Sequence, residues 1–217
     1  MRSAYHGLED LPETIPVFPL AGAILFPRAR LPLNVFEPRY LAMVDAALAG
    51  ARVIGMIQPS EVEGKRPALY PVGCLGRLTS FAETGDGRYL ITLTGVVRFR
   101  IAQELDAVTP FRQVHPRYDE FLTDLKSPPD SEVPRERLIA ALKLYLRDRN
   151  VQIDWQAVEK APDEHLLNAT AMLCPFQPAE KQALLETHTL AARNDTLLTL
   201  LEMANLAPGG DDGRSVQ

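Results

Sequence analysis

The chain has 217 residues, 46% of them hydrophobic and 24% charged, a balance that is typical of one large or two small globular domains. Its longest apolar run, residues 20–26, is much shorter than the roughly 20 residues that cross a bilayer, and the acidic N-terminus lacks the apolar region of a secretory signal. Residues 1–118 carry a net charge of +2 and residues 119–217 one of −7. Neither half has the strong basic excess of a general nucleic-acid binder.

The first half predicts short strands around one helix. Strand-like runs occur at residues 15–20, 31–36, 52–57 and 112–118, and residues 38–49 have helical spacing, with Gly50 as a left-handed stop. The strongest local signal is Gly85-Asp86-Gly87 between two long alternating runs, 72–84 and 88–101, which predicts a hairpin. Gly95 interrupts the second run and predicts a bulge. These elements indicate a small closed or nearly closed barrel.

The second half predicts a helical bundle. Three prolines interrupt the periodicity at residues 123–134, which we interpret as a linker. Helical patterns follow at residues 138–150, 155–160, 164–173, 179–186 and 190–206. We expect residues 208–217 to be disordered. The predicted fold class is therefore α+β, with a β-rich subdomain at 1–122 and a helical bundle at 135–207.

The known catalytic motifs are missing from the sequence. There is no phosphate-binding loop, no dinucleotide-binding turn, no HExxH pair and no GxSxG nucleophile. The four histidines, His6, His115, His165 and His188, are scattered singly. Cys74 and Cys174 lie 100 positions apart, which argues against both a disulfide framework and a zinc site and favours reduced thiols in the cytoplasm. We expect no enzymatic activity, no catalytic residues, no cofactor and no metal.

An ordered series of short motifs identifies a family resemblance. The motifs are IPVFPL at 15–20, LFP at 25–27, LPLNVFEPRY at 31–40, VGCLGRL at 72–78, GVVRFR at 95–100, PF at 175–176 and EKQALLE at 180–186. Together they resemble the N-terminal, substrate-binding domain of the Lon protease family over residues 12–206. The resemblance implies a PUA-like pseudo-barrel followed by helices, in a free-standing member that lacks the ATPase and protease domains.

What the resemblance implies is a protein- or peptide-binding module for unfolded segments or a specific protein partner. We expect its apolar surface near residues 20–30 and the junction with the helices, with Phe26, Arg28, Arg30, Tyr118 and Phe176 as candidate contacts. Residues 20–30 could instead close the mouth of the barrel, with their apolar side buried. The client and the oligomeric state stay open.

An RNA-binding PUA-like protein is the alternative. It would require Arg98, Arg100, Arg112 and Arg117 to form one basic stripe, and alternation places Arg98 and Arg100 on the same side of a strand. The acidic second half of the chain makes nucleic acid the weaker prediction.

Overall fold

The computed structural model describes residues 5–60, 67–126, 133–147 and 154–206. Two long antiparallel strands, β4 (Val72–Glu83) and β5 (Tyr89–Glu104), form the centre of the sheet. The Thr84 amide donates to the Arg88 carbonyl at 2.8 Å, and Gly87 takes a φ of 78° in the turn between them. This confirms the predicted hairpin, because glycine adopts a positive φ without steric cost.

Four shorter strands complete the sheet: β1 (Ile15–Pro19), β2 (Arg30–Val35), β3 (Val53–Ile57) and β6 (Arg112–Arg117). Their order is β2-β5-β4-β3-β1-β6, and β6 also pairs with β5. That last pairing closes β5, β4, β3, β1 and β6 into the predicted barrel and leaves β2 as the terminal strand. All pairs are antiparallel except β1 with β3.

Helix α1 (Pro38–Ala49) covers part of the barrel and buries Tyr40, Met43, Val44 and Ala47. Pro38 suits its first turn, since an N–H there would have no helical partner. The predicted left-handed stop at Gly50 is wrong, because Gly50 has a φ of −119°. Arg52 takes the positive φ of 57° instead, and its amide bonds to the Ala47 carbonyl at 2.9 Å, so the turn closes two residues later.

Residues 20–30 cross the barrel with their apolar side inward. Ile24, Leu25 and Phe26 are at most 2% exposed. Gly95 of β5 lies directly against them, since a Cβ on Gly95 would be 1.9 Å from the Phe26 carbonyl oxygen. The β4–β5 register shifts beside this glycine, between Leu75 and Gly76, which confirms the predicted irregularity. The segment therefore closes the barrel, and only glycine at 95 permits its close approach.

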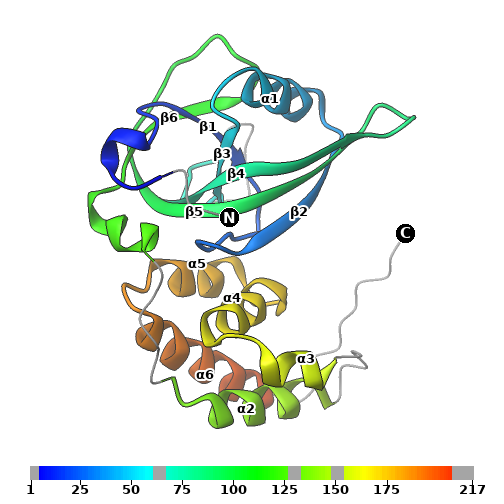
Figure 1. Ribbon diagram of the computed structural model, residues 1–217, viewed down its shortest axis with the longest axis vertical. Coiled ribbons are helices and arrows are strands. Elements are labelled where there is room, and N and C mark those ends of the chain that lie inside the picture. Colours follow the sequence, from blue (N-terminus) through cyan, green and yellow to red (C-terminus); the bar gives the residue numbers. More distant parts are fainter. Residues whose placement is uncertain (1–4, 61–66, 127–132, 148–153, 207–217) are drawn as a thin grey trace.

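The helices of the second half of the chain lie together on one side of the barrel, with α4 and α5 nearest to it, and α1 lies on another side (Figure 1). They are α2 (Arg135–Arg147), α3 (Trp155–Lys160), α4 (Asp163–Leu173), α5 (Pro178–Glu186) and α6 (Leu190–Leu206). Two short 3-10 helices lie outside this group: η1 (Leu8–Asp10) precedes the first strand, and η2 (Asp119–Leu125) connects β6 to the helical half. Local signals begin two of the helices in the group: Asp154 accepts from the Gln156 and Ala157 amides, and Gln177 and Glu180 form a capping box.

The boundary between the halves differs from the predicted linker at 123–134. Residues 123–125 belong to η2, and Asp124 is only 7% exposed. Burial follows from its position between the barrel and the helices, where it accepts hydrogen bonds from Arg98. Residues 127–132 and the predicted disordered tail lie outside the described residues.

Candidate functional site

An apolar groove of about 460 Å³ lies where the barrel meets α4. Residues 22–24 and 28–32 form its barrel wall, and His165, Asn168, Ala169, Met172 and Leu173 form the helix wall. His165, Ala169 and Leu173 recur every four residues, which places them on one side of α4, away from the buried Leu167 and Ala171. We call this site the β2–α4 groove.

Leu173, the last residue of α4, is 82% exposed. A leucine so exposed is unremarkable alone, but here it borders a hollow whose other lining groups include Ile24, Leu31 and Met172. The lining contains two arginines and one histidine and no aspartate or glutamate. The β2–α4 groove is thus apolar with a positive rim, in a chain of net charge −5.

Arg28 lines the groove and also joins the two halves of the chain. Its Nε donates to Glu164 Oε2 at 2.8 Å and its Nη2 to Oε1 at 2.5 Å, while Nη1 donates to the carbonyls of Asp124 and Lys126. Burial alone would lower the pKa of Arg28, but the hydrogen bonds and charge of Glu164 outweigh it and raise that pKa. The main role of Arg28 is therefore structural: it connects the barrel to α4.

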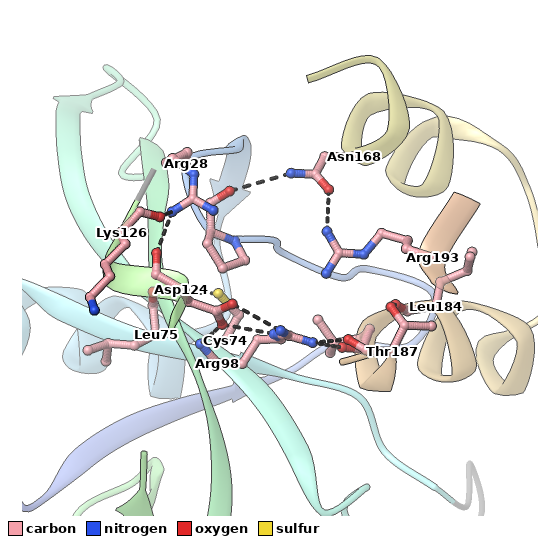
Figure 2. Close-up of polar contacts among 12 residues, drawn as sticks. Arg28, Cys74, Leu75, Arg98, Asp124, Lys126, Asn168, Leu184, Thr187 and Arg193 are labelled. Atoms are coloured by element: carbon pink, nitrogen blue, oxygen red, sulfur yellow. Dashed lines mark hydrogen bonds and ion pairs between the residues drawn. The ribbon is translucent and has the colours of Figure 1, made fainter. Parts of the chain in front are cut away.

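Arg193 of α6 is buried and contacts Asn168, one of the groove's lining residues. Its guanidinium stands 4.2 Å from the centre of the Phe26 ring, and its Nη1 donates to Asn168 Oδ1 at 2.7 Å. Asn168 in turn donates to the Pro27 carbonyl at 3.5 Å (Figure 2). Burial, followed by repulsion from Arg98, lowers the pKa of Arg193 to about 10. These buried polar contacts hold Asn168 in place and make this part of the groove lining rigid.

The residues expected to contact a partner fall into two groups. Arg28 and Arg30 line the β2–α4 groove, and Arg30 is exposed. Phe26, Tyr118 and Phe176 are only 0%, 5% and 8% exposed, so none of the three side chains lies open to a partner in this structure. Phe26 closes the barrel, Tyr118 donates its hydroxyl proton to the Pro12 carbonyl at 3.0 Å, and Phe176 packs near Tyr145 in the helical half.

The helix wall of the groove was missed from sequence. In the sequence, Ala169, Met172 and Leu173 look like ordinary members of an apolar helix. The one available signal was their helical spacing, which puts them on a different side from Leu167 and Ala171. Only the packing of α4 against α5 and α6 shows which of its two apolar faces stays open.

The four arginines of the RNA-binding alternative are all paired with acidic side chains. The pairs are Arg98 with Asp124 (2.8 Å), Arg100 with Glu120 (2.8 Å), Arg112 with Glu104 (2.6 Å) and Arg117 with Glu120 (3.6 Å). Arg98 is also buried, with a side chain that is 3% exposed. Charges neutralised in this way release few counterions from nucleic acid, so the stripe gives the alternative no support.

Two other parts of the surface can be compared with the groove as places where a partner could bind. A hollow of about 440 Å³ lies beside α1, bordered by Tyr40, Phe111 and Arg112, and its lining is more polar. Phe36, Phe81 and Leu90 are exposed large apolar side chains near the β4–β5 turn, at 62%, 40% and 46% exposure. Within residues 5–60, 67–126, 133–147 and 154–206, no cluster of three or more His, Cys, Asp or Glu could hold a metal, and no helix could span a membrane.

The substrate-binding domain of ATP-dependent protease La (LON) matches residues 14–203. The chain belongs to this family. It is 30% identical over 203 residues to Lon protease 2 of Myxococcus xanthus, covering 89% of this chain and 24% of that protein. It is 29% identical over 203 residues to the Lon protease of Anaeromyxobacter dehalogenans, covering 89% and 23%. The chain thus spans about a quarter of the length of the curated relatives it matches.

Solved structures of Lon N-terminal domains have the same fold. The N-terminal domain of the Mycobacterium avium complex Lon protease aligns with a TM-score of 0.62 at 16% identity, covering 87% of this chain and 98% of that one. The Lon N-terminal domain protein from Xanthomonas campestris aligns with a TM-score of 0.60 at 23% identity, covering 86% and 97%. The α+β Lon-type fold predicted from the motifs is therefore confirmed.

Proposed function

We propose that this Lon-type domain recognises other proteins by binding short apolar segments of them in the β2–α4 groove, without cutting them. The observation that carries the proposal is Leu173, 82% exposed on the wall of an apolar hollow that no carboxylate lines. Membership of a substrate-binding domain family supports the same reading.

The chemistry of the groove favours unfolded or partly unfolded clients. A folded protein keeps its large apolar side chains inside, so a segment that offers them is one that has lost its structure or never had one. Burying two such side chains contributes about 3–6 kcal/mol, part of which offsets the cost of association. We expect weak binding, with dissociation constants on the order of millimolar.

The test is a binding titration with a fluorescently labelled, unstructured apolar peptide followed by anisotropy. Leu173→Asp places a charge on the groove wall and should weaken binding by about tenfold or more, equivalent to about 1.4 kcal/mol. Leu206→Asp is the matched control, since Leu206 is 83% exposed and lies outside the groove lining. Equal affinities in Leu173→Asp and wild type would contradict the proposal.

We also propose that the protein works in the cytoplasm. Cys74 and Cys174 are both buried, and no disulfide joins them. Chains that act in oxidising compartments more often use cysteines in disulfides, whereas buried free thiols are usual in a reducing one.

A further inference from the structure

Strand β2 offers an open edge. It is the terminal strand of the sheet and pairs through Arg30–Val35 with β5 alone. The Gly95 amide donates to the Ala29 carbonyl at 2.9 Å, which sets the alternation of the antiparallel ladder. Main-chain groups of Leu31 and Leu33 therefore point to β5, and those of Arg30, Pro32 and Asn34 point away from it.

Pro32 fits this alternation. Proline has no N–H, so it is tolerated in a strand only where that position faces away from the ladder. With Pro32 on the outward side, the pairing with β5 loses no hydrogen bond. The open edge near the groove then presents one donor, the Arg30 N–H, and two acceptors, the carbonyls of Arg30 and Pro32.

This edge forms the barrel wall of the β2–α4 groove. Five consecutive residues, 28–32, line the hollow. A strand that faced the hollow with one of its two faces would contribute alternate residues only. Consecutive lining residues therefore place the edge of the chain, with its main-chain groups, toward the space in front of α4, on the side of the barrel that faces the helices (Figure 1).

We propose that the occupant of the groove binds as an added strand on the open edge of β2, with apolar side chains toward α4 and an acidic side chain beside Arg30. The proposal rests on the proposed function and specifies its ligand: an extended segment in which apolar residues alternate and a carboxylate is present. Strand addition is a common mode of peptide recognition, in which main-chain bonds give affinity and side-chain pockets give selectivity.

Charge complementarity supports the acidic residue. Arg30 is exposed, and none of the ion pairs within the described residues includes it. Arg28 and His165 are the other titratable groups of the lining, and Arg28 is already paired with Glu164. A carboxylate that approaches the edge would meet Arg30 without repulsion from any acidic lining residue.

The first experiment is amide hydrogen exchange by NMR on the full-length protein. The probe is an acetylated six-residue peptide with leucine at alternate positions and one aspartate, at saturating concentration. The Arg30 amide should exchange about tenfold more slowly when the peptide is bound, because it then donates to the peptide. The amides of Leu31 and Leu33 already bond to β5 and should not change.

The second experiment uses a matched pair of variants to separate the contribution of the Arg30 main-chain hydrogen bond from that of the Arg30 charge. Arg30→Ala should remove the preference for the aspartate peptide over its lysine analogue, and leave the remaining affinity intact. Arg30→Pro removes the same charge and also the outward N–H, so it should weaken binding of both peptides by a further five- to tenfold, on the order of one charge-free hydrogen bond. An ester in place of each peptide amide in turn removes the peptide N–H groups that would donate to the carbonyls of Arg30 and Pro32, and so tests those bonds without altering the protein.

The outcomes are distinct. Peptide binding that Leu173→Asp abolishes, without slower exchange at Arg30 and without any effect of the ester peptides, would overturn strand addition and leave the proposed function standing. Absence of peptide binding would overturn both. Protection of the Arg30 amide that grows with protein concentration in the absence of peptide would show a second copy on the edge, and would also overturn the proposal.

Discussion

Arg28 and Glu164 join the barrel to α4 through two hydrogen bonds, although they are 136 positions apart in the chain. Arg28 adopts a left-handed φ of 64°, which directs the chain out of the barrel at this point. The Glu164 side chain is 10% exposed and that of Arg28 is 32% exposed. A carboxylate so nearly buried depends on its partner, because an unpaired charge there would be costly.

Arg28→Ala should destabilise the protein by about 2 kcal/mol, less than a fully buried pair would because Arg28 is partly solvated. Denaturant unfolding measures the loss. Arg88→Ala is the control: Arg88 pairs with Asp86 at 3.0 Å, with side chains 51% and 58% exposed, and its loss should cost under about 0.5 kcal/mol. Similar losses of unfolding free energy in the two variants would show that the Arg28–Glu164 pair stabilises the fold no more than an exposed ion pair does.

Phe26→Ala should cost about 3–5 kcal/mol in the free energy of unfolding, because Phe26 is fully buried and the barrel cannot close over the space it leaves. Phe36→Ala offers the contrast: Phe36 is 62% exposed, so its truncation should change stability by less than about 1 kcal/mol. An unchanged denaturation midpoint for Phe26→Ala would contradict this prediction, because it would mean that residues 20–30 form an exposed loop and do not close the barrel.

The two halves should unfold in one transition. Arg98 of β5 donates to the Leu185 carbonyl of α5 at 3.0 Å, and Gln58 donates to Gln182 at 3.2 Å. A fragment of residues 1–122 would lose Asp124 and leave the Arg98 guanidinium buried without its carboxylate, so it should be much less stable than the whole chain. Calorimetry is the measurement, and two separated transitions would contradict this.

Alkaline pH should weaken the fold through Cys74. Burial, followed by the charge of Asp124, raises the pKa of the Cys74 thiol above its usual 9.0. The folded protein then keeps a proton that the unfolded chain releases, so stability is complete below pH 9.0 and falls as the pH rises further, by at most about 1.4 kcal/mol per pH unit.

Cys74→Ala isolates this effect. The variant should lose the slope of unfolding free energy against pH between 9.0 and 10.0. The upper limit is set by Tyr5 and Tyr118, whose pKa values burial raises above 10.0 and which add their own slope beyond it. A wild-type stability that stays flat across the window would disprove the role of Cys74.

Local signals predicted much of the fold. The β4–β5 hairpin follows from Gly85-Asp86-Gly87 between alternating runs, and α5 begins where Pro178 allows, because such preferences act within a few residues. The role of Arg28 could not be predicted in this way, since its partner lies 136 positions away. The burial of Tyr118 and Phe176 and the exposure of Leu173 likewise depend on how whole elements pack.

The most direct test of the β2–α4 groove is a chemical-shift map. The isotopically labelled protein is titrated with an unstructured apolar peptide, and the amides whose chemical shifts change are located on the structure. We predict that they cluster at residues 22–32 and at His165, Ala169, Met172 and Leu173. Shifts concentrated instead at the exposed Phe36, Phe81 and Leu90, or at the hollow beside α1, would contradict the assignment of the groove as the binding site.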